Sequence, residues 1–233
     1  MILEDFTRAV SQSFDSRFLL VLLKALALTI GLLIAFWFGM GWLLSGLSDW
    51  SFTLPLIGEV GVGFLAVRLA WLAVALASAL LMFPVAAIFI GFFLDEVVSA
   101  VEARFYPHLP QIRPQPFAET LADAVQFFLL MLAVNLVALV FYLISGPLAP
   151  FVFWTVNGYL LAREYFQMVA ARRLPPAEAR ALRKKNGGEV FLAGLLMAIP
   201  LTVPVLNLII PILGVATFAH LFHRLSGTLP VRT

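Results

Sequence analysis

Residues 124–162 read AVQFFLLMLAVNLVALVFYLISGPLAPFVFWTVNGYLLA and contain no charged side chain. About 20 apolar residues in a helix cross the hydrocarbon core of a bilayer, so this stretch is too long for one straight crossing. Ser145-Gly146-Pro147 and then Pro150 interrupt it where a chain turns. The stretch therefore predicts two helices joined by a tight turn. The second helix is expected to stop at Arg163-Glu164, after entering the membrane without crossing it.

Composition places the whole chain in the class of integral membrane proteins. Hydrophobic residues make up 62% of the chain and charged residues 12%, and the mean hydropathy is +1.01. Soluble domains carry about 25% charged residues, so several spans and no separate soluble domain are expected. The first apolar segment is much longer than the core of a signal peptide, so we expect the N-terminus to stay attached. The chain has no cysteine, which excludes disulfides and thiolate ligands.

Two other apolar segments predict long transmembrane helices, over residues 18–47 and 60–105. The second is expected to continue past Asp95-Glu96 and to leave the membrane before Pro107. Ahead of them, residues 1–17 place apolar side chains at helical spacing opposite acidic ones. That pattern predicts an amphipathic helix at the membrane interface.

Prolines divide the last apolar stretch of the chain. Pro200, Pro204 and Pro211 leave neither side with about 20 residues of unbroken helix. We therefore predict one pair of re-entrant, half-membrane helices within residues 189–225 and another within 119–173.

The fold class predicted for residues 1–233 is an all-α integral membrane protein forming a single membrane domain. It contains the two long helices, the two re-entrant pairs and the amphipathic helix. Irregular backbone at membrane depth must be covered by protein or line a water-filled path. A homo-oligomer, a solute path or both are therefore expected.

The distribution of Lys and Arg predicts the orientation in the membrane. The loop between the two long helices has neither residue, whereas the connectors on the other side carry many. By the positive-inside rule both termini are expected in the cytoplasm, provided that each broken pair returns to the side from which it came. The same placement explains the sequence pI of about 9.2 without any binding of nucleic acid.

Four blocks of this sequence resemble the CysZ sulfate permease family. They are Phe93-Leu94-Asp95-Glu96-Val97-Val98, the run from Asn157-Gly158-Tyr159 to Glu164-Tyr165-Phe166, Arg180-Ala181-Leu182-Arg183, and the run from Ile199-Pro200 to Ala216-Thr217. The resemblance covers nearly the whole chain in order, and the second block is its most specific part. It implies two long and several half-membrane helices, multimers, and no cofactor or ATP-binding module. The function it implies is a permease or channel that admits sulfate across the bacterial inner membrane for cysteine synthesis.

The resemblance also points to an anion site before the first long helix. Members of the sulfate-permeating branch of the family carry a Gly-Leu-Arg element and a further basic residue there, whereas this chain reads Asp15-Ser16-Arg17-Phe18. Arg17 is retained, and Asp15 adds a negative charge beside it. Ser16, Arg17 and the free N–H groups of a helix start are predicted to bind sulfate or a related oxyanion. As an alternative, Arg17 anchors the helix at the level of the lipid headgroups.

Several polar residues within apolar segments are candidates for a pore or for a structural network. Lipid penalises such groups, so we expect them to meet one another or water. They are Asn157, Tyr159, Arg163, Glu164 and Asn207.

The sequence carries no motif of an enzyme. His220 and His223 are three residues apart, without an HExxH motif or an acidic third ligand, so no metal site is predicted. GxSxG and Gly-rich nucleotide loops are also missing, so neither catalytic residues nor a cofactor are expected. Two functions remain: a passive or gradient-driven sulfate pathway, or a membrane scaffold of the same fold that transports nothing.

Overall fold

The computed structural model describes residues 1–45, 51–54, 58–61, 63–110, 112, 116–203, 206–228 and 230. Residues 46–47 of the first predicted long helix and residue Pro204 of the predicted break lie outside the described residues. The elements in chain order are α1 (Ile2–Gln12), α2 (Ser16–Ser45), β1 (Ser51–Leu54), β2 (Gly58–Gly61), α3 (Gly63–Phe92), α4 (Leu94–Phe105), α5 (Phe117–Ser145), the 3₁₀ turn η1 (Gly146–Leu148), α6 (Ala149–Ala171), α7 (Pro176–Lys185), α8 (Gly187–Ala198), the 3₁₀ turn η2 (Pro200–Thr202) and α9 (Leu206–Leu225).

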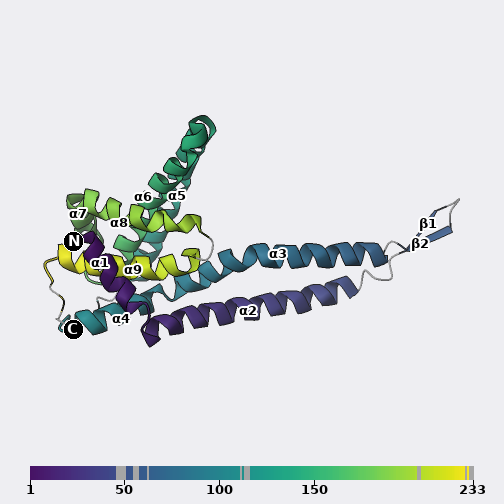
Figure 1. The fold of residues 1–233 in the computed structure, drawn as a ribbon, viewed down its shortest axis with the longest axis horizontal. Helices are drawn as coiled ribbons and strands as arrows, with labels where there is room; N and C mark the ends of the chain where they lie inside the picture. Colours follow the sequence, from purple (N-terminus) through teal and green to yellow (C-terminus); the bar gives the residue numbers. More distant parts are fainter. Residues whose placement is uncertain are drawn as a thin grey trace. The chain divides into compact units, whose positions relative to one another are not determined.

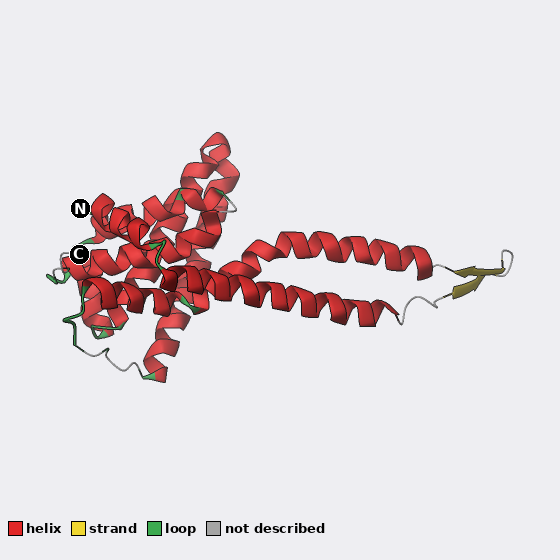
Figure 2. Ribbon diagram, turned by 60° about the horizontal axis from the view of Figure 1, so that its bottom comes forward, coloured by secondary structure: helices red, strands yellow, loops and turns green. Residues whose placement is uncertain are grey.

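The chain divides into two compact units. Unit 1 comprises Met1–Val21 and Phe93–Thr233, and unit 2 comprises Leu22–Phe92. Helices account for most of both units, as Figure 2 shows in red. The structure thus confirms the all-α fold class.

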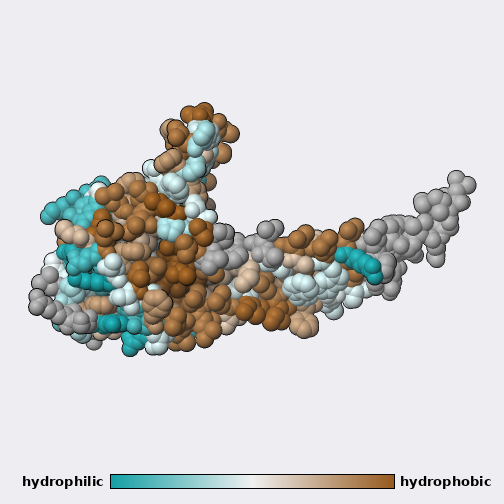
Figure 3. Space-filling view, in the orientation of Figure 1, coloured by the Kyte–Doolittle hydropathy of each residue, from teal (hydrophilic) through white to brown (hydrophobic). Residues whose placement is uncertain are grey.

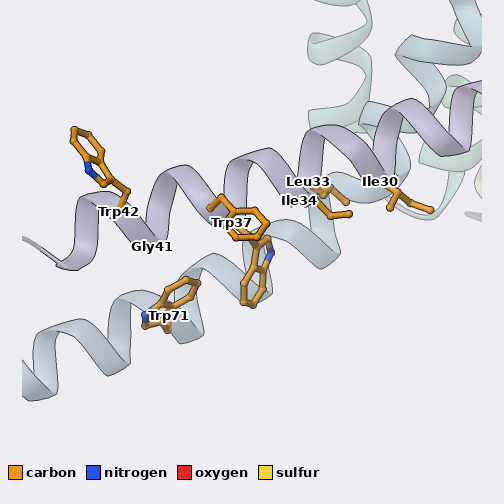
Figure 4. Close-up of a pocket in the computed structure, with 8 residues that line it drawn as sticks. Ile30, Leu33, Ile34, Trp37, Gly41, Trp42 and Trp71 are labelled. Carbon is orange, nitrogen blue, oxygen red and sulfur yellow. The ribbon is translucent and has the colours of Figure 1, made fainter.

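Unit 2 holds two long helices and a short ribbon that the sequence did not predict. α2 and α3 have 30 residues each, or about 45 Å at 1.5 Å per residue, against about 30 Å of hydrocarbon. The strands β1 and β2 pair antiparallel between them, with Ser51 opposite Gly61. Trp37 of α2 fastens the helices together, because its Nε1 donates to Ser78 Oγ at 3.0 Å and its ring lies 5.2 Å from that of Trp71. Figure 4 shows the apolar hollow around these rings.

The single helix expected over residues 60–105 is in fact two helices. α3 ends at Phe92, and Phe93 has the non-helical backbone angles φ −102° and ψ 2° before α4 begins. α4 carries Asp95 and Glu96 in its first turn, where carboxylates are favourable to the helix dipole. The acidic pair therefore starts a new helix rather than continuing the old one.

The core of unit 1 forms where α6 and α9 meet α4 and α8 (Figure 1). Phe166 of α6 lies edge-on to Phe222 of α9 at 5.9 Å, and Tyr165 lies edge-on to Phe218 at 5.8 Å. All four side chains are buried. Gly194 of α8 lets α8 approach α6 closely, since a Cβ at this position would clash with the backbone of α6.

The first broken stretch is a helical hairpin. α5 and α6 are joined by η1, and Gly146 at the turn has φ 49°, a left-handed angle that favours glycine. The expectation that the second arm stops at Arg163-Glu164 is wrong, because α6 runs without interruption to Ala171. Arg and Glu are good helix formers, and here they continue the helix beyond its apolar part.

The second broken stretch is asymmetric. α8 has 12 residues and ends before the 3₁₀ turn at Pro200, as the prolines predict. α9, however, has 20 residues and contains Pro211, so the expectation that neither side reaches about 20 residues is wrong. Pro211 lies within the first two turns of α9. The helix tolerates the one backbone hydrogen bond that proline removes there, because most of its residues follow Pro211.

Three segments of the described chain are long and apolar enough to cross a membrane. They are Ser16–Ser45, Leu121–Ala171, which joins α5 to α6, and Leu206–Leu225. In Figure 3 the α5–α6 hairpin is mostly hydrophobic, and hydrophilic residues gather on unit 1 around α7. The protein is therefore a multi-pass membrane protein.

Candidate functional site

The predicted anion residues Ser16 and Arg17 line a pocket in unit 1. The pocket has a volume of about 290 Å³, and it is lined by Gln12, Asp15, Ser16, Arg17, Ala100, Ala103 and Arg104. The end of α1, the start of α2 and one face of α4 form its walls. Arg104, which the sequence did not single out, faces the pocket from α4 and forms an ion pair with Asp15.

The charges of this pocket sum to a positive excess. Arg17 and Arg104 contribute two cations and Asp15 one anion. Arg17 is exposed and forms no ion pair within the described part of the chain. The backbone carbonyl of Asp15 accepts the N–H groups of Phe18 and Leu19, so α2 begins here and its positive dipole end points toward the pocket. Such an arrangement suits an oxyanion.

The larger hollow in unit 2 does not suit an anion. It has a volume of about 810 Å³ and is lined by Ile30, Leu33, Ile34, Trp37, Phe38, Gly41, Trp42 and Trp71. No charged side chain is among them. A dianion would lose its hydration there without gaining donors.

The polar candidates of α6 do not gather into one network. Asn157 Nδ2 donates to Phe153 O at 2.8 Å in its own helix, and no hydrogen bond joins it to Glu164 or Asn207 among the residues that the structure describes. Tyr159 is exposed. Glu164 Oε2 is buried and has no hydrogen-bond partner in the described part of the chain.

Arg163 stands out among these candidates. Its guanidinium carbon lies 5.6 Å from the centre of the Phe127 ring of α5, a cation–π contact. Its Nη1 is buried without a hydrogen-bond partner in the described part of the chain. Burial, and after it the positive charge of Arg163, lowers the pKa of Arg183 in α7. A concentration of positive charge therefore lies where α6 and α7 meet.

A second group of charges, centred on Glu102 of α4, was not predicted. Arg173 Nη2 donates to Glu102 Oε2 at 2.7 Å, Arg172 Nη2 lies 3.5 Å from the same oxygen, and His223 Nε2 donates to Oε1 at 3.1 Å. Burial by itself raises the pKa of Glu102. The hydrogen bonds from His223 and Arg173 and the charges of both arginines outweigh burial and lower this pKa to about 2.

Two further contacts extend this group. Arg172 also binds Asp95 at 3.0 Å. Tyr106, which follows α4, shares a hydrogen bond of 3.1 Å with Nδ1 of buried His220. Burial raises the pKa of Tyr106, so its hydroxyl stays protonated. Each histidine of α9 therefore has one ring nitrogen bonded to a protein side chain, His220 to Tyr106 and His223 to Glu102.

A third ion pair network closes unit 1 at the N-terminus. Arg224 of α9 binds Asp5 of α1 at 2.7 Å and Glu189 of α8 at 2.6 Å. Asp5 is 1% exposed, and burial raises its pKa despite the opposing charge of Arg224. This network holds α1, α8 and α9 together.

Comparison with known families agrees with the resemblance seen in the sequence. Residues 5–211 match the family described as Sulfate transporter CysZ/Etoposide-induced protein 2.4. The chain belongs to this family. A search of curated proteins finds no match.

Family membership gives the Glu102 cluster its context. Within a chain of this family, Arg172 and Arg173 follow α6 and bind the buried carboxylate of Glu102. The cluster joins α4 to the end of α6 and to α9. It is therefore a clamp between elements, whereas the pocket at Arg17 has charge directed toward open space.

Proposed function

We propose that the chain admits sulfate, or a closely related oxyanion, across the bacterial inner membrane to the cytoplasm, where sulfate serves cysteine synthesis. The observation that supports this most is the pocket of about 290 Å³ at the start of α2, which has an excess of positive charge in a chain of the CysZ family. Ser16 and Arg17 bind the anion first. The protein acts as a permease or channel, and no step requires a cofactor.

The ion pair between Asp15 and Arg104 affects how strongly this site binds an anion. Asp15 would repel a dianion, but Arg104 offsets its charge from the opposite wall. The side chains of Arg104 and Asp15 are 42% and 34% exposed, so solvent weakens the pair and an incoming anion can compete for Arg104. Arg17 remains the cation with no internal partner among the described residues. This is why we assign sulfate recognition to Arg17.

Sulfate binding to the purified protein tests the assignment. Arg17→Ala removes a charge-assisted contact of about 1.5–3 kcal/mol, so affinity should fall roughly ten- to a hundredfold. Asp15→Gly should strengthen binding, because it removes the repulsion and frees Arg104. Arg8→Ala is the matched control, since Arg8 lies on neighbouring α1 and pairs with Glu4 outside the pocket. Equal losses for Arg17→Ala and Arg8→Ala would mean that only net charge matters.

The exposure pattern of α1 supports its placement at the membrane interface. Leu3 of α1 is 67% exposed and Phe14, in the turn after α1, is 79% exposed, whereas polar Asp5 and Gln12 are buried against the protein. In water, this exposure of apolar side chains and burial of polar ones would be unfavourable. Lipid at the interface covers such an apolar face. Both termini then lie on the cytoplasmic side, together with the basic α7.

The lengths of two of the four arms support re-entrant pairs. The uncharged residues 149–162 of α6 extend about 20 Å and the 12 residues of α8 about 18 Å. Each is shorter than the hydrocarbon core of about 30 Å. The turns at η1 and η2 therefore reach into the membrane and need cover from other protein, which a homo-oligomer provides.

The alternative, a scaffold that transports nothing, is favoured by one observation. The Glu102 and Asp5 clusters both fasten helices together, and neither carboxylate lines either of the two pockets described above. Such a protein would bind no sulfate, and the binding experiment above would show no difference between its variants.

A further inference from the structure

Three arginines lie close together where α6 meets α7. Arg163 belongs to α6, and Arg180 and Arg183 lie one turn apart on α7, which packs against α6 (Figure 1). None of the three forms an ion pair within the described part of the chain, and this includes pairing with Glu164 beside Arg163. Nη1 of Arg163 is buried there without a hydrogen-bond partner. We call these three residues the arginine cluster.

The arginine cluster is unfavourable without an anion, because like charges repel one another. Burial lowers the pKa of Arg183, and the positive charges of Arg163 and Arg180 lower this pKa further. The carboxylate of Asp123 opposes the effect only weakly, and one of its oxygens already accepts a hydrogen bond from Gln167. An anion bound between the guanidinium groups would remove the repulsion and supply the acceptor that Arg163 lacks.

The arginine cluster lies where the apolar part of the α5–α6 hairpin ends. Residues 124–162 carry no charge, and Arg163 is the first charged residue after them. Tyr159 precedes Arg163 by four residues on the same face of α6 and is 45% exposed. Tyrosine is enriched where hydrocarbon meets the lipid headgroups. In Figure 3 the hydrophilic residues around α7 adjoin hydrophobic surface. The arginines are therefore at the depth of the lipid phosphate groups.

We propose that the arginine cluster binds the phosphate group of an anionic membrane lipid such as phosphatidylglycerol, with the hydroxyl of Tyr159 as a further donor. Guanidinium groups bind phosphate oxygens through paired, charge-assisted hydrogen bonds. A zwitterionic lipid fits less well, because its ammonium group brings another positive charge to the cluster.

Two observations favour a lipid over a free oxyanion. None of the three arginines lines either pocket described above, so neither pocket would enclose a free ion beside them. The hydrophobic surface next to the cluster is in addition suited to the acyl chains of a lipid. The proposal does not depend on whether the protein transports sulfate.

Native mass spectrometry of the delipidated full chain, titrated with phosphatidylglycerol or phosphatidylcholine, tests the site. Wild type should bind the first phosphatidylglycerol at least severalfold more tightly than phosphatidylcholine. Arg163→Gln and Arg183→Gln should each raise the dissociation constant of phosphatidylglycerol roughly fivefold, the effect of one basic residue near the headgroups. Equal affinity of wild type for the two lipids would overturn the proposal.

Lys185→Gln is the matched control for this titration. It removes the same charge from the same helix, and Lys185 is exposed. At about 100° per residue, Lys185 lies on the side of α7 opposite to Arg180 and Arg183. This variant should therefore bind phosphatidylglycerol as wild type does. If Lys185→Gln and Arg183→Gln lost affinity equally, net charge rather than the arginine cluster would attract the lipid, and the proposal would fail.

Thermal unfolding in detergent separates a lipid from a free oxyanion. Without lipid, Arg183→Gln should unfold at the same temperature as wild type or at a higher one, because it relieves the repulsion. A lower temperature would overturn the argument that the cluster lacks an anion. Phosphatidylglycerol should raise the unfolding temperature of wild type by roughly 2–4 °C more than that of Arg183→Gln. If sodium sulfate or sodium phosphate produced this difference and phosphatidylglycerol did not, the cluster would bind a free oxyanion and the lipid proposal would be wrong.

Discussion

At the scale of single residues, Glu102 is the side chain on which the stability of unit 1 depends most. Glu102→Gln keeps the shape but leaves Arg172 and Arg173 facing a neutral group in a buried site. Breaking a buried ion pair in this way costs about 3–5 kcal/mol. Glu178→Gln on the exposed face of α7 is the control and should have little effect. Unfolding in detergent measures both, and equal stability of the two variants would contradict the clamp.

The same residue predicts a dependence on pH. The pKa of Glu102 is about 2 in the folded protein and ordinarily 4.5. Because the folded-state pKa is the lower one, the carboxylate stabilises the fold fully above about pH 4.5 and loses this effect as the pH falls toward 2. The loss is about 3 kcal/mol at about 1.4 kcal/mol per pKa unit. Glu102→Gln should lack this part of the acid sensitivity.

The sequence predicted some of the charged groups of this protein but missed others. The resemblance to the CysZ family pointed to Ser16 and Arg17, and the apolar run that follows them placed these residues at a helix start. Sequence reasoning did not find Glu102, whose partners Arg173 and His223 lie 71 and 121 residues away. Nothing in the local sequence distinguishes a buried carboxylate from a solvated one. Only the approach of α4, α6 and α9 reveals it.

At the scale of elements, the contact between α6 and α8 depends on glycine. A Cβ at Gly194 would lie 2.6 Å from Ala162 Cβ, and one at Gly158 would lie 3.0 Å from Leu195 Cα. Gly194→Ala must therefore push the helices apart, and overpacking of this kind costs about 1–3 kcal/mol. Gly188→Ala is the control, since nothing lies within 4 Å of its Cβ position. Similar unfolding temperatures for the two variants would refute the close contact.

The sequence predicted the helix boundary correctly at the turn and wrongly at the charged residues. Ser145-Gly146-Pro147 marks the turn at η1, because glycine supplies the positive φ there. The charged pair Arg163-Glu164 did not end α6, since charged residues end the apolar part of a helix without ending its hydrogen bonds. Pro211 likewise failed to break α9. Helix ends depend on backbone chemistry, and the membrane boundary depends on side chains.

The proposed re-entrant arms predict a pattern of labelling in oriented vesicles. Single cysteines at Gly146 and Asn207 should resist a membrane-impermeant reagent added to the outer face, whereas one at Ser51, in the loop between the long helices, should react readily. Ser51 also reports insertion direction in the same preparation. Strong outer-face labelling at Gly146 would mean that α5 and α6 cross the membrane completely.

At the scale of the whole molecule, composition and periodicity suffice for the class of protein, and the family match over residues 5–211 agrees with them. They do not predict the division into units or the β1–β2 ribbon. Four residues per strand are too few for a clear alternating pattern.

The central claim is that this chain passes sulfate, and uptake of radiolabelled sulfate by liposomes containing the purified protein tests it most directly. Wild type should take up sulfate well above empty liposomes, Arg17→Ala should take up much less, and Arg8→Ala should match wild type. If wild type takes up sulfate and Arg17→Ala takes up as much, the binding site would instead lie near Arg163. Wild-type protein that is folded and correctly inserted, yet passes no more sulfate than empty liposomes, would contradict the claim and leave the scaffold in its place.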